Sequence, residues 1–217
     1  MIAVRTQIKI CGITSVEEAV YLNNAKVDYA GFVFFEKSKR NVSMEQAQKI
    51  INALDPSMKT VAVTVEPDSK LVHAIEKAGF SILQVHGELK NEVIAQTNLP
   101  IWKSMNLTDL TSAWEQMNRL AGIEDKIAGY LLDAPSYGSG QTFSWDTFLK
   151  NQKAEELLAK LKQKTFVLAG GLHAENVRKG IEIFAPDVVD VSSGVEGETG
   201  KEQTKINEFV RKVREHG

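Results

Sequence analysis

The sequence is poor in cysteine, in long apolar runs and in net charge. Cys11 is the only cysteine, so no disulfide can form within the chain, and we expect a reducing, cytoplasmic location. No stretch of about 18 apolar residues occurs, so we expect no membrane span. Residues 1–10 lack the apolar core of a signal peptide. The formal net charge is only −2, and no basic tail is present, so we expect no nucleic-acid partner.

What the sequence does contain is a regular alternation of short apolar runs and longer amphipathic segments. These predict strands at 8–10, 29–35, 60–65, 82–85, 101–104, 127–133, 165–169 and 188–191, and helices at 15–24, 43–54, 68–78, 90–97, 110–121, 145–161, 174–184 and 202–214. Ser15, Ser43 and Asp68 stand where three of the helices would need N-caps, and Glu18 completes a capping box with Ser15. Strict alternation of this kind predicts a parallel sheet.

Eight strand–helix units favour a single-domain α/β fold, the (β/α)8 TIM barrel, over a doubly wound open sheet. The strands are continuous apolar runs such as residues 165–169 (TFVLA), which is typical of strands buried on both faces. No linker or low-complexity segment divides the chain, so we expect one catalytic domain over residues 1–217. The one long irregular stretch, residues 134–144, has the length at which loops in compact domains are often functional.

In barrels of this type the catalytic side chains lie at the carboxyl ends of the strands. The first strand ends at Cys11, followed by Gly12, which would let a substrate approach the backbone, and the sixth ends at Asp133. These two strands lie nearly opposite each other in an eight-strand ring. A thiol and a carboxyl group could therefore face one substrate from two sides, which suits a proton-transfer isomerase. The structural alternatives are a buried core thiol for Cys11 and an Asx turn for Asp133.

The turns after the last two strands predict a phosphate site. Residues 169–172 (AGGL) and 191–194 (VSSG) are glycine-containing turns that lead into helices, with Gly170, Gly171, Ser193 and Gly194 as the candidate contacts. Backbone N–H groups at such turns bind anions. Two of them after the seventh and eighth strands form a phosphate site in many barrels. The alternative is that these glycines only allow close packing of the turns.

Two further segments carry candidate binding residues. Arg40 follows the second strand and could hold a substrate carboxylate by a two-point contact, or could belong to a solvated charged loop. His86 follows the fourth strand, where a single histidine is more often structural than catalytic. The remaining histidines, His73, His173 and His216, are scattered along the chain, so we expect no metal site.

Taken together, these segments resemble the phosphoribosylanthranilate isomerase family along nearly the whole chain. The matching segments are 9–13 (KICGI), 28–34 (DYAGFVF) with Ser38 and Arg40, 84–87 (QVHG), 132–134 (LDA), 143–145 (FSW), 168–172 (LAGGL), 176–177 (NV) and 190–196 (DVSSGVE). The resemblance implies a cofactor-free Amadori rearrangement in tryptophan biosynthesis. It converts N-(5-phosphoribosyl)anthranilate to 1-(2-carboxyphenylamino)-1-deoxyribulose 5-phosphate.

The resemblance also implies roles for single residues. Cys11 matches the family's base and Asp133 its acid. Arg40 falls where the family holds the anthranilate carboxylate, and the two glycine-containing turns fall where it holds the phosphate. His86 belongs to a matching segment and is assigned to substrate binding, and Asp190 matches a position at the mouth that helps to orient the substrate.

Several positions bear on how well these roles carry over. Tyr137 stands where the family has a glycine in the loop after the sixth strand, Thr64 where phenylalanine is common, and Glu202 where aspartate is common. We expect the Lys9 side chain to lie on the strand face opposite Cys11, and so to have little effect on the thiol pKa. The thiol itself is expected to open to the barrel mouth.

Two other functions would also fit a phosphate-binding barrel. A sugar-phosphate isomerase of histidine biosynthesis would carry paired aspartates on the first and fifth strands, where this chain has Cys11 and the Lys103, Ser104 pair. A catalytically idle phosphate-binding barrel would keep the glycine-containing turns and would not need Cys11 and Asp133 together. The isomerase is favoured, with a small phosphosugar as its substrate and a monomer or homodimer as its assembly.

Overall fold

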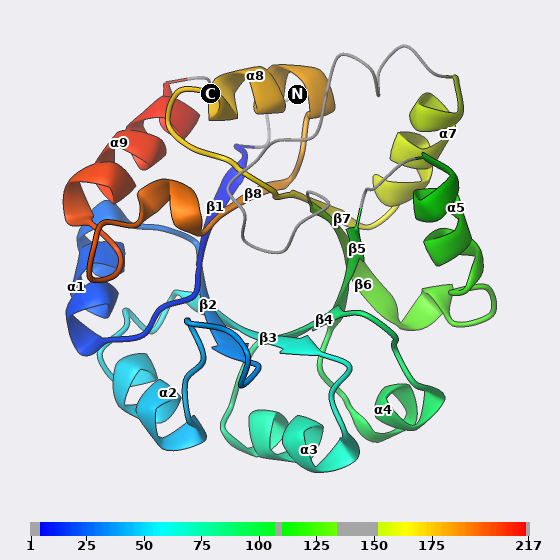
Figure 1. Ribbon diagram of the computed structural model, residues 1–217, viewed down its shortest axis with the longest axis horizontal. Helices are drawn as coiled ribbons and strands as arrows, with labels where there is room; N and C mark the ends of the chain where they lie inside the picture. The colour runs from blue at the N-terminus through cyan, green and yellow to red at the C-terminus, as the bar shows by residue number, and fades with distance from the viewer. Residues whose placement is uncertain (1–4, 107–109, 134–151, 216–217) are drawn as a thin grey trace.

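The strands close into one parallel barrel. The computed structural model describes residues 5–106, 110–133 and 152–215. Within these residues the strands pair in chain order, and β8 pairs with β1 to complete the ring (Figure 1). They are β1 (Gln7–Cys11), β2 (Tyr29–Phe34), β3 (Lys59–Val65), β4 (Ile82–His86), β5 (Ile101–Asn106), β6 (Ile127–Asp133), β7 (Thr165–Leu168) and β8 (Val188–Val191). The closed ring confirms the predicted barrel and excludes the open sheet.

The helices lie outside the ring of strands, as Figure 1 shows. They are α1 (Val16–Ala25), α2 (Met44–Ile51), α3 (Ser69–Lys77), α4 (Asn91–Gln96), α5 (Leu110–Asn118), α7 (Gln152–Leu161), α8 (Val177–Phe184) and α9 (Gln203–Arg214), with short 3₁₀ helices η1 (Glu124–Lys126) and η2 (Ser193–Val195). Ser15, Ser43 and Asp68 cap α1, α2 and α3 as predicted, and Ser15 forms the capping box with Glu18. Each cap satisfies an N–H group that the first helical turn leaves unbonded.

Element ends differ from the prediction by a few residues. His86 is the last residue of β4 rather than the residue after it, and β5 runs on to Asn106 instead of ending at 104. The predicted loop at 134–144, which includes Tyr137, lies outside the described residues. So does the first part of the predicted helix at 145–161, and α7 covers the rest of that helix from Gln152.

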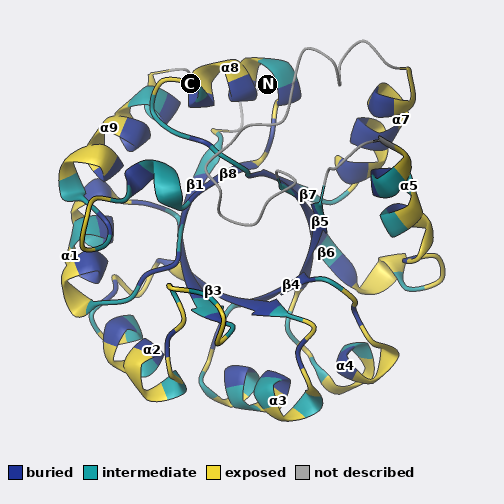
Figure 2. Cartoon of the chain, viewed as in Figure 1, coloured by how far each residue is buried: buried dark blue, intermediate teal, exposed yellow. Residues whose placement is uncertain are grey.

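Apolar side chains pack on both sides of the barrel wall. The larger core lies between strands and helices, and Figure 2 shows it as the dark blue of the strands and of the inward sides of the helices. A smaller cluster, on which Cys11 packs, consists of Tyr29, Val61, Val63, Ile82, Trp102, Leu131, Val167, Ala169 and Val188. Within the described residues, no helix has the combined length and apolar character that crossing a bilayer would require.

Candidate active site

One cavity of about 520 Å³ gathers the predicted site residues at the carboxyl ends of the strands. Every one of them except Gly194 contributes to its lining: Cys11, Arg40, His86, Asp133, Gly170, Gly171, Asp190 and Ser193. Barrel enzymes carry their catalytic groups at this end. The segments meet because parallel strands in a closed ring all end on the same side.

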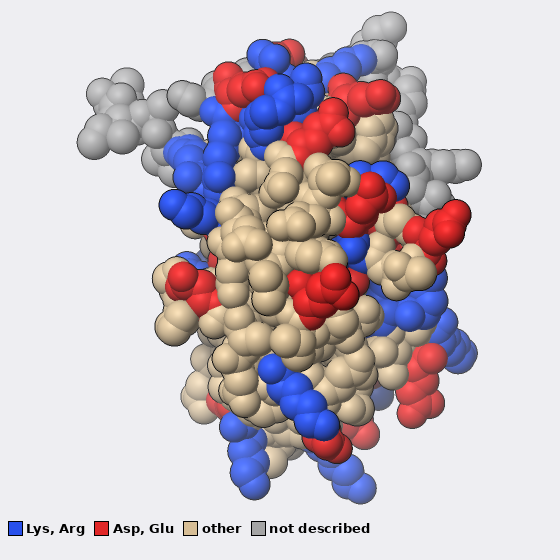
Figure 3. All heavy atoms as spheres, turned by 90° about the vertical axis from the view of Figure 1, so that its left-hand side faces the viewer, with Lys and Arg blue, Asp and Glu red and all other residues tan. Residues whose placement is uncertain are grey.

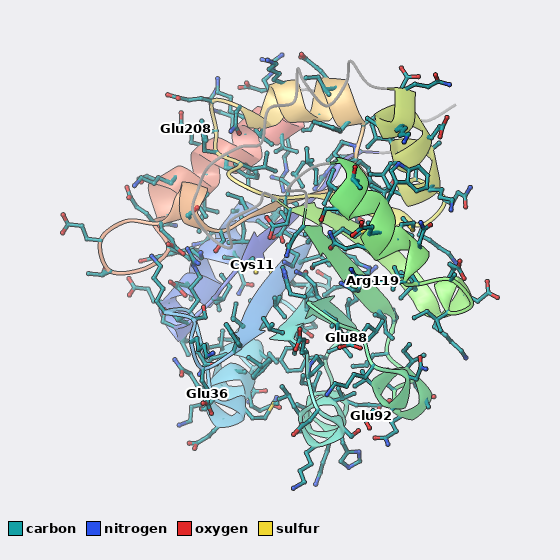
Figure 4. All side chains as sticks on the ribbon, turned by 45° about the vertical axis from the view of Figure 1, so that its right-hand side comes forward. Cys11, Glu36, Glu88, Glu92, Arg119 and Glu208 are labelled. Carbon is teal, nitrogen blue, oxygen red and sulfur yellow. The ribbon has the colours of Figure 1, made fainter. Side chains whose placement is uncertain are left out.

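Cys11 and Asp133 reach the cavity from different parts of the barrel wall. Cys11 is the last residue of β1 and Asp133 the last of β6, and both are partly exposed at the cavity. Figure 4 labels Cys11 among the strands in the middle of the molecule. A proton acceptor and a proton donor can therefore reach one bound molecule.

Lys9 lies on the same face of β1 as Cys11, so the prediction that it faces away is wrong. Side chains alternate along a strand, and residues two positions apart therefore share a face. Lys9 is fully buried, and its Nζ lies 2.7 Å from Oδ2 of Asp190 on the neighbouring strand β8. Burial raises the pKa of the Cys11 thiol, and the Lys9 ammonium opposes this rise without cancelling it.

Asp190 is buried and contributes to the cavity lining. Its Oδ2 accepts the hydrogen bond of Lys9, while Oδ1 has no partner among the described residues. Because a buried carboxylate oxygen without a donor is costly, a hydroxyl group of a bound ligand would stabilise this side chain. The position fits the predicted role of Asp190 in orienting a substrate.

His86 is buried beside Gln84, with 2.9 Å between Gln84 Nε2 and His86 Nε2. Burial lowers the pKa of His86 to about 3, and the nearby Lys103 and Lys9 ammonium groups add to the effect. The ring is therefore neutral at pH 7. His86 thus offers a neutral polar surface to the cavity rather than a positive charge.

Arg40 is held in place by Glu196 rather than moving in a solvated loop. Its Nε and Nη2 lie 2.5 and 2.9 Å from the two carboxylate oxygens of Glu196, and the side chain is 14% exposed. The same carboxylate accepts a hydrogen bond from Lys201 Nζ at 2.7 Å and forms an ion pair with Lys39 Nζ at 3.1 Å. Lys201 Nζ also donates to the backbone carbonyl and the hydroxyl of Ser192. This cluster ties the β2–α2 connection to the segment after β8.

Gly12 makes room for Arg40. Its φ is 80°, in the left-handed region that favours glycine, and a Cβ there would overlap the Arg40 side chain. Gly12 does not contribute to the cavity lining. The predicted role for this glycine, close approach of the substrate to the backbone, is therefore replaced by close approach of a guanidinium side chain.

The turn after β7 is shaped by two glycines and an asparagine. Gly170 and Gly171 have φ values of 89° and 63°. The Asn176 side chain accepts from the His173 N–H and donates to the Gly171 carbonyl. Residues 174–176 form a turn, and α8 begins at Val177 instead of residue 174. After β8 comes η2, a short extra helix of the kind that completes the phosphate site in many barrels.

Gly194, in η2, does not contribute to the cavity lining. A Cβ on Gly194 would overlap the Leu172 carbonyl oxygen and stand 3.0 Å from His173 Cβ. The glycine therefore lets the turn after β8 pack directly against the turn after β7. Ser192 and Ser193, from the same segment, do line the cavity.

Glu196 and Lys201 were missed as candidates. Arg40 and Glu196 are 156 positions apart, so no local pattern in the sequence could connect them. Lys9 could have been found, because the two-residue period of a strand places it beside Cys11. Among the described residues, no group of three or more His, Cys, Asp or Glu could hold a metal ion. Metal independence remains a prediction.

The fold and the cavity together define a class of protein. A closed parallel (β/α)8 barrel that brings a thiol, a carboxyl group and two glycine-containing turns to the carboxyl ends of its strands is a barrel enzyme. A profile of the N-(5'-phosphoribosyl)anthranilate (PRA) isomerase family matches residues 8–212. The chain belongs to this family.

Individual relatives agree with this assignment. The N-(5'-phosphoribosyl)anthranilate isomerase of Streptococcus gordonii is 37% identical over 211 residues, which cover 97% of this chain and 98% of the relative. That of Geotalea uraniireducens is 37% identical over 215 residues, covering 96% and 98%. The crystal structure of phosphoribosylanthranilate isomerase from Thermotoga maritima superposes with a TM-score of 0.80 at 31% identity, covering 97% and 99%. A structure of the enzyme in complex with reduced 1-(o-carboxyphenylamino)-1-deoxyribulose 5-phosphate also gives a TM-score of 0.80, at 29% identity and the same coverage.

Proposed function

We propose that this chain isomerises N-(5'-phosphoribosyl)anthranilate to 1-(2-carboxyphenylamino)-1-deoxyribulose 5-phosphate, with Cys11 as the base and Asp133 as the acid. The observation that carries the proposal is that both residues line one cavity in a barrel that belongs to the PRA isomerase family. The reaction is an internal redox rearrangement of the aldose–ketose type and is a step in tryptophan biosynthesis. It needs no external oxidant or reductant.

The proposed chemistry takes two proton transfers. Asp133, protonated at the start, gives its proton to the ribose ring oxygen as the C1–O bond breaks, which leaves an iminium ion. The Cys11 thiolate then removes the proton from C2, and the electron pair of that C–H bond forms an enolamine, which tautomerises to the ketone. Acid and base come from opposite parts of the wall, so each can act on its own side of the substrate.

The two ends of the substrate carry negative charge, and the cavity has a group for each. We assign the phosphate to the backbone of the turns at Gly170, Gly171 and Ser193, which line the cavity at one side. We assign the anthranilate carboxylate to Arg40. Glu196 takes Nε and one N–H of Nη2, so the edge formed by Nη1 and the second N–H of Nη2 is the one that would bind the substrate in two points.

We further propose that residues 1–217 act as one catalytic domain in the cytoplasm, on a small phosphosugar, as a monomer or homodimer without nucleic acid or membrane. A single cysteine supports a reducing compartment. On the face drawn in Figure 3, basic and acidic side chains are interspersed rather than separated, which does not favour a polyanion. The Thermotoga maritima relative is described as dimeric and has been solved as a monomer.

The activity is tested directly by fluorescence, because the anthranilate-type substrate and product differ in emission. Purified protein should convert the substrate at a rate proportional to enzyme concentration. Expression should also restore growth without tryptophan to an auxotroph that lacks this isomerase. A folded protein that fails in both experiments would overturn the proposed function, and turnover of a histidine-pathway phosphosugar alone would replace it.

A further inference from the structure

The side chains of Lys9 and Cys11 both lie against Gly31 of the neighbouring strand β2, which has no side chain of its own. Gly31 of β2 pairs with Cys11 in register. A Cβ on Gly31 would lie 3.0 Å from Cys11 Sγ and 3.2 Å from Lys9 Cε. The absence of a side chain at Gly31 therefore lets the lysine stem and the thiol share one small space inside the barrel. Any larger residue at position 31 would crowd both side chains.

The Lys9 ammonium is a permanent charge in this space. Burial by itself would lower the pKa of Lys9, but the carboxylate of Asp190 at 2.7 Å, together with Cys11, more than offsets that effect, so the net shift of the pKa is upward. Lys9 thus stays protonated at neutral pH. It is neither the proposed acid nor the proposed base, and it is not part of the cavity lining.

Other charged groups also face the thiol. Asp190 raises the pKa of Cys11 and Lys201 lowers it, in addition to the effects of burial and of Lys9. Arg40, whose own pKa the thiol raises, lies at the mouth with Glu196. Lys9 has the largest favourable effect on the thiolate among these groups. Asp190 reduces this effect, because the Lys9 ammonium then interacts with two negative groups, the Asp190 carboxylate and the thiolate.

We propose that Lys9 is the positioning residue of the base: its buried ammonium, held by Asp190, supplies the positive charge against which the Cys11 thiolate forms. The inference rests on the proposed function only in taking Cys11 as the base. As the thiolate forms, the cluster gains one negative charge beside a fixed positive one. With the thiolate formed, one ammonium faces two anions; when Cys11 takes the C2 proton, the extra negative charge is removed and the neutral Lys9–Asp190 pair is left behind.

The test reads the thiol without using activity. Cys11 is the only cysteine, so incorporation of iodoacetamide, followed by mass spectrometry between pH 6 and 10, reports its thiolate fraction alone. Lys9→Met should shift the rate profile to higher pH and slow alkylation at pH 7 by about tenfold or more, since a nearby opposite charge shifts a pKa by about one to three units. The acid limb of kcat/KM should move in the same direction.

Two further variants keep the test decisive. If Lys9→Met unfolds because Asp190 is left unpaired, the double variant Lys9→Met, Asp190→Asn removes both charges and should still alkylate more slowly than the wild type. Lys103→Met is the matched control, because Lys103 is also a buried barrel lysine but has no part in the thiol's pKa shift. Its alkylation profile should stay at the wild-type position.

Each outcome of these experiments supports or overturns the proposed role of Lys9. Unchanged alkylation profiles in both Lys9 variants, or an equal shift in Lys103→Met, would overturn the role of Lys9. A shifted profile in the Lys9 variants alone supports it. Failure of the proposed function looks different: Cys11→Ala would then keep near-native turnover, while the effect of Lys9 on the thiol would persist.

Discussion

Replacing Glu196 by glutamine should destabilise the folded protein markedly. The substitution keeps the shape of the side chain but removes the charge that pairs with Arg40, Lys201 and Lys39. Removing one partner of a buried pair costs about 3–5 kcal/mol, whereas an exposed pair contributes less than about 1 kcal/mol. Glu196 is 13% exposed and Lys201 only 1%, so we expect a loss between these limits, about 2–3 kcal/mol. For a chain of this size that corresponds to a fall in Tm of about 4–12 °C.

The loss should depend on pH in one direction. Burial would raise the pKa of Glu196, but the hydrogen bond from Arg40 and the charge of Lys201 outweigh it and hold that pKa well below its ordinary value of 4.5. A carboxyl group whose pKa is depressed by folding stabilises the fold above its unfolded pKa, and this contribution is lost as the pH falls through its folded pKa. The difference between wild type and Glu196→Gln should therefore be complete at pH 7 and shrink below about pH 4.5.

Urea unfolding at several pH values measures this difference, with Glu45→Gln as the matched control. Glu45 also pairs with a lysine, Lys49, but both side chains are largely exposed, so its loss should have little effect. An equal, small effect of both substitutions, or a difference for Glu196→Gln that stays constant from pH 7 to pH 3.5, would refute the reasoning. Steady-state kinetics should also show a raised KM, because Arg40 loses the group that orients it.

The remaining predictions concern the reaction. Cys11→Ala and Asp133→Asn should each lower kcat by about 10²- to 10⁴-fold, and by more than Arg40→Ala, which should mainly raise KM because it removes a ground-state contact. Near-native turnover of Cys11→Ala would show that another group is the base. Treatment with EDTA should leave activity intact, and a loss restored by a divalent ion would contradict the metal-free mechanism. Gly194→Val should raise KM and abolish the stabilisation that inorganic phosphate gives in a thermal melt, because the new side chain would push the Leu172 turn aside; persistent stabilisation would place the anion site elsewhere. A product analogue with both phosphate and anthranilate groups should slow alkylation of Cys11, and no protection would mean that the thiol lies outside the bound ligand's reach.

The parts of the fold that local chemistry determines could be predicted from the sequence. The caps at Ser15, Ser43 and Asp68 act within a few residues of themselves, so their helix starts were predicted correctly. The start of α8 was predicted three residues too early, because residues 174–176 form a turn whose Asn176 side chain bonds to the His173 N–H and the Gly171 carbonyl. Hydrophobic periodicity does not record such side-chain bonds.

The candidate site likewise has features that the sequence could predict and features that it could not. Strand ends could be assigned to one end of the barrel, since topology alone brings Cys11 and Asp133 to a common cavity. The partner of Arg40 could not be assigned, because Glu196 is distant in sequence and comes next to Arg40 only when the barrel closes. Position 194 requires a glycine because a Cβ there would overlap the carbonyl oxygen of Leu172, which belongs to the turn after a different strand. Contacts between turns of different strands are decided by side-chain geometry that single-sequence patterns do not contain.

The ion pair between Lys9 and Asp190 also bears on how the chain is made. The two residues are 181 positions apart and sit on adjacent strands that close the ring. As the chain emerges from the ribosome, β1 comes out with a lysine whose partner has not yet been synthesised, and burying that lysine alone would be costly. A partly formed barrel that buries Lys9 without Asp190 is therefore unfavourable in free energy. Pairing of β8 with β1 removes this cost, so the last strand stabilises the first.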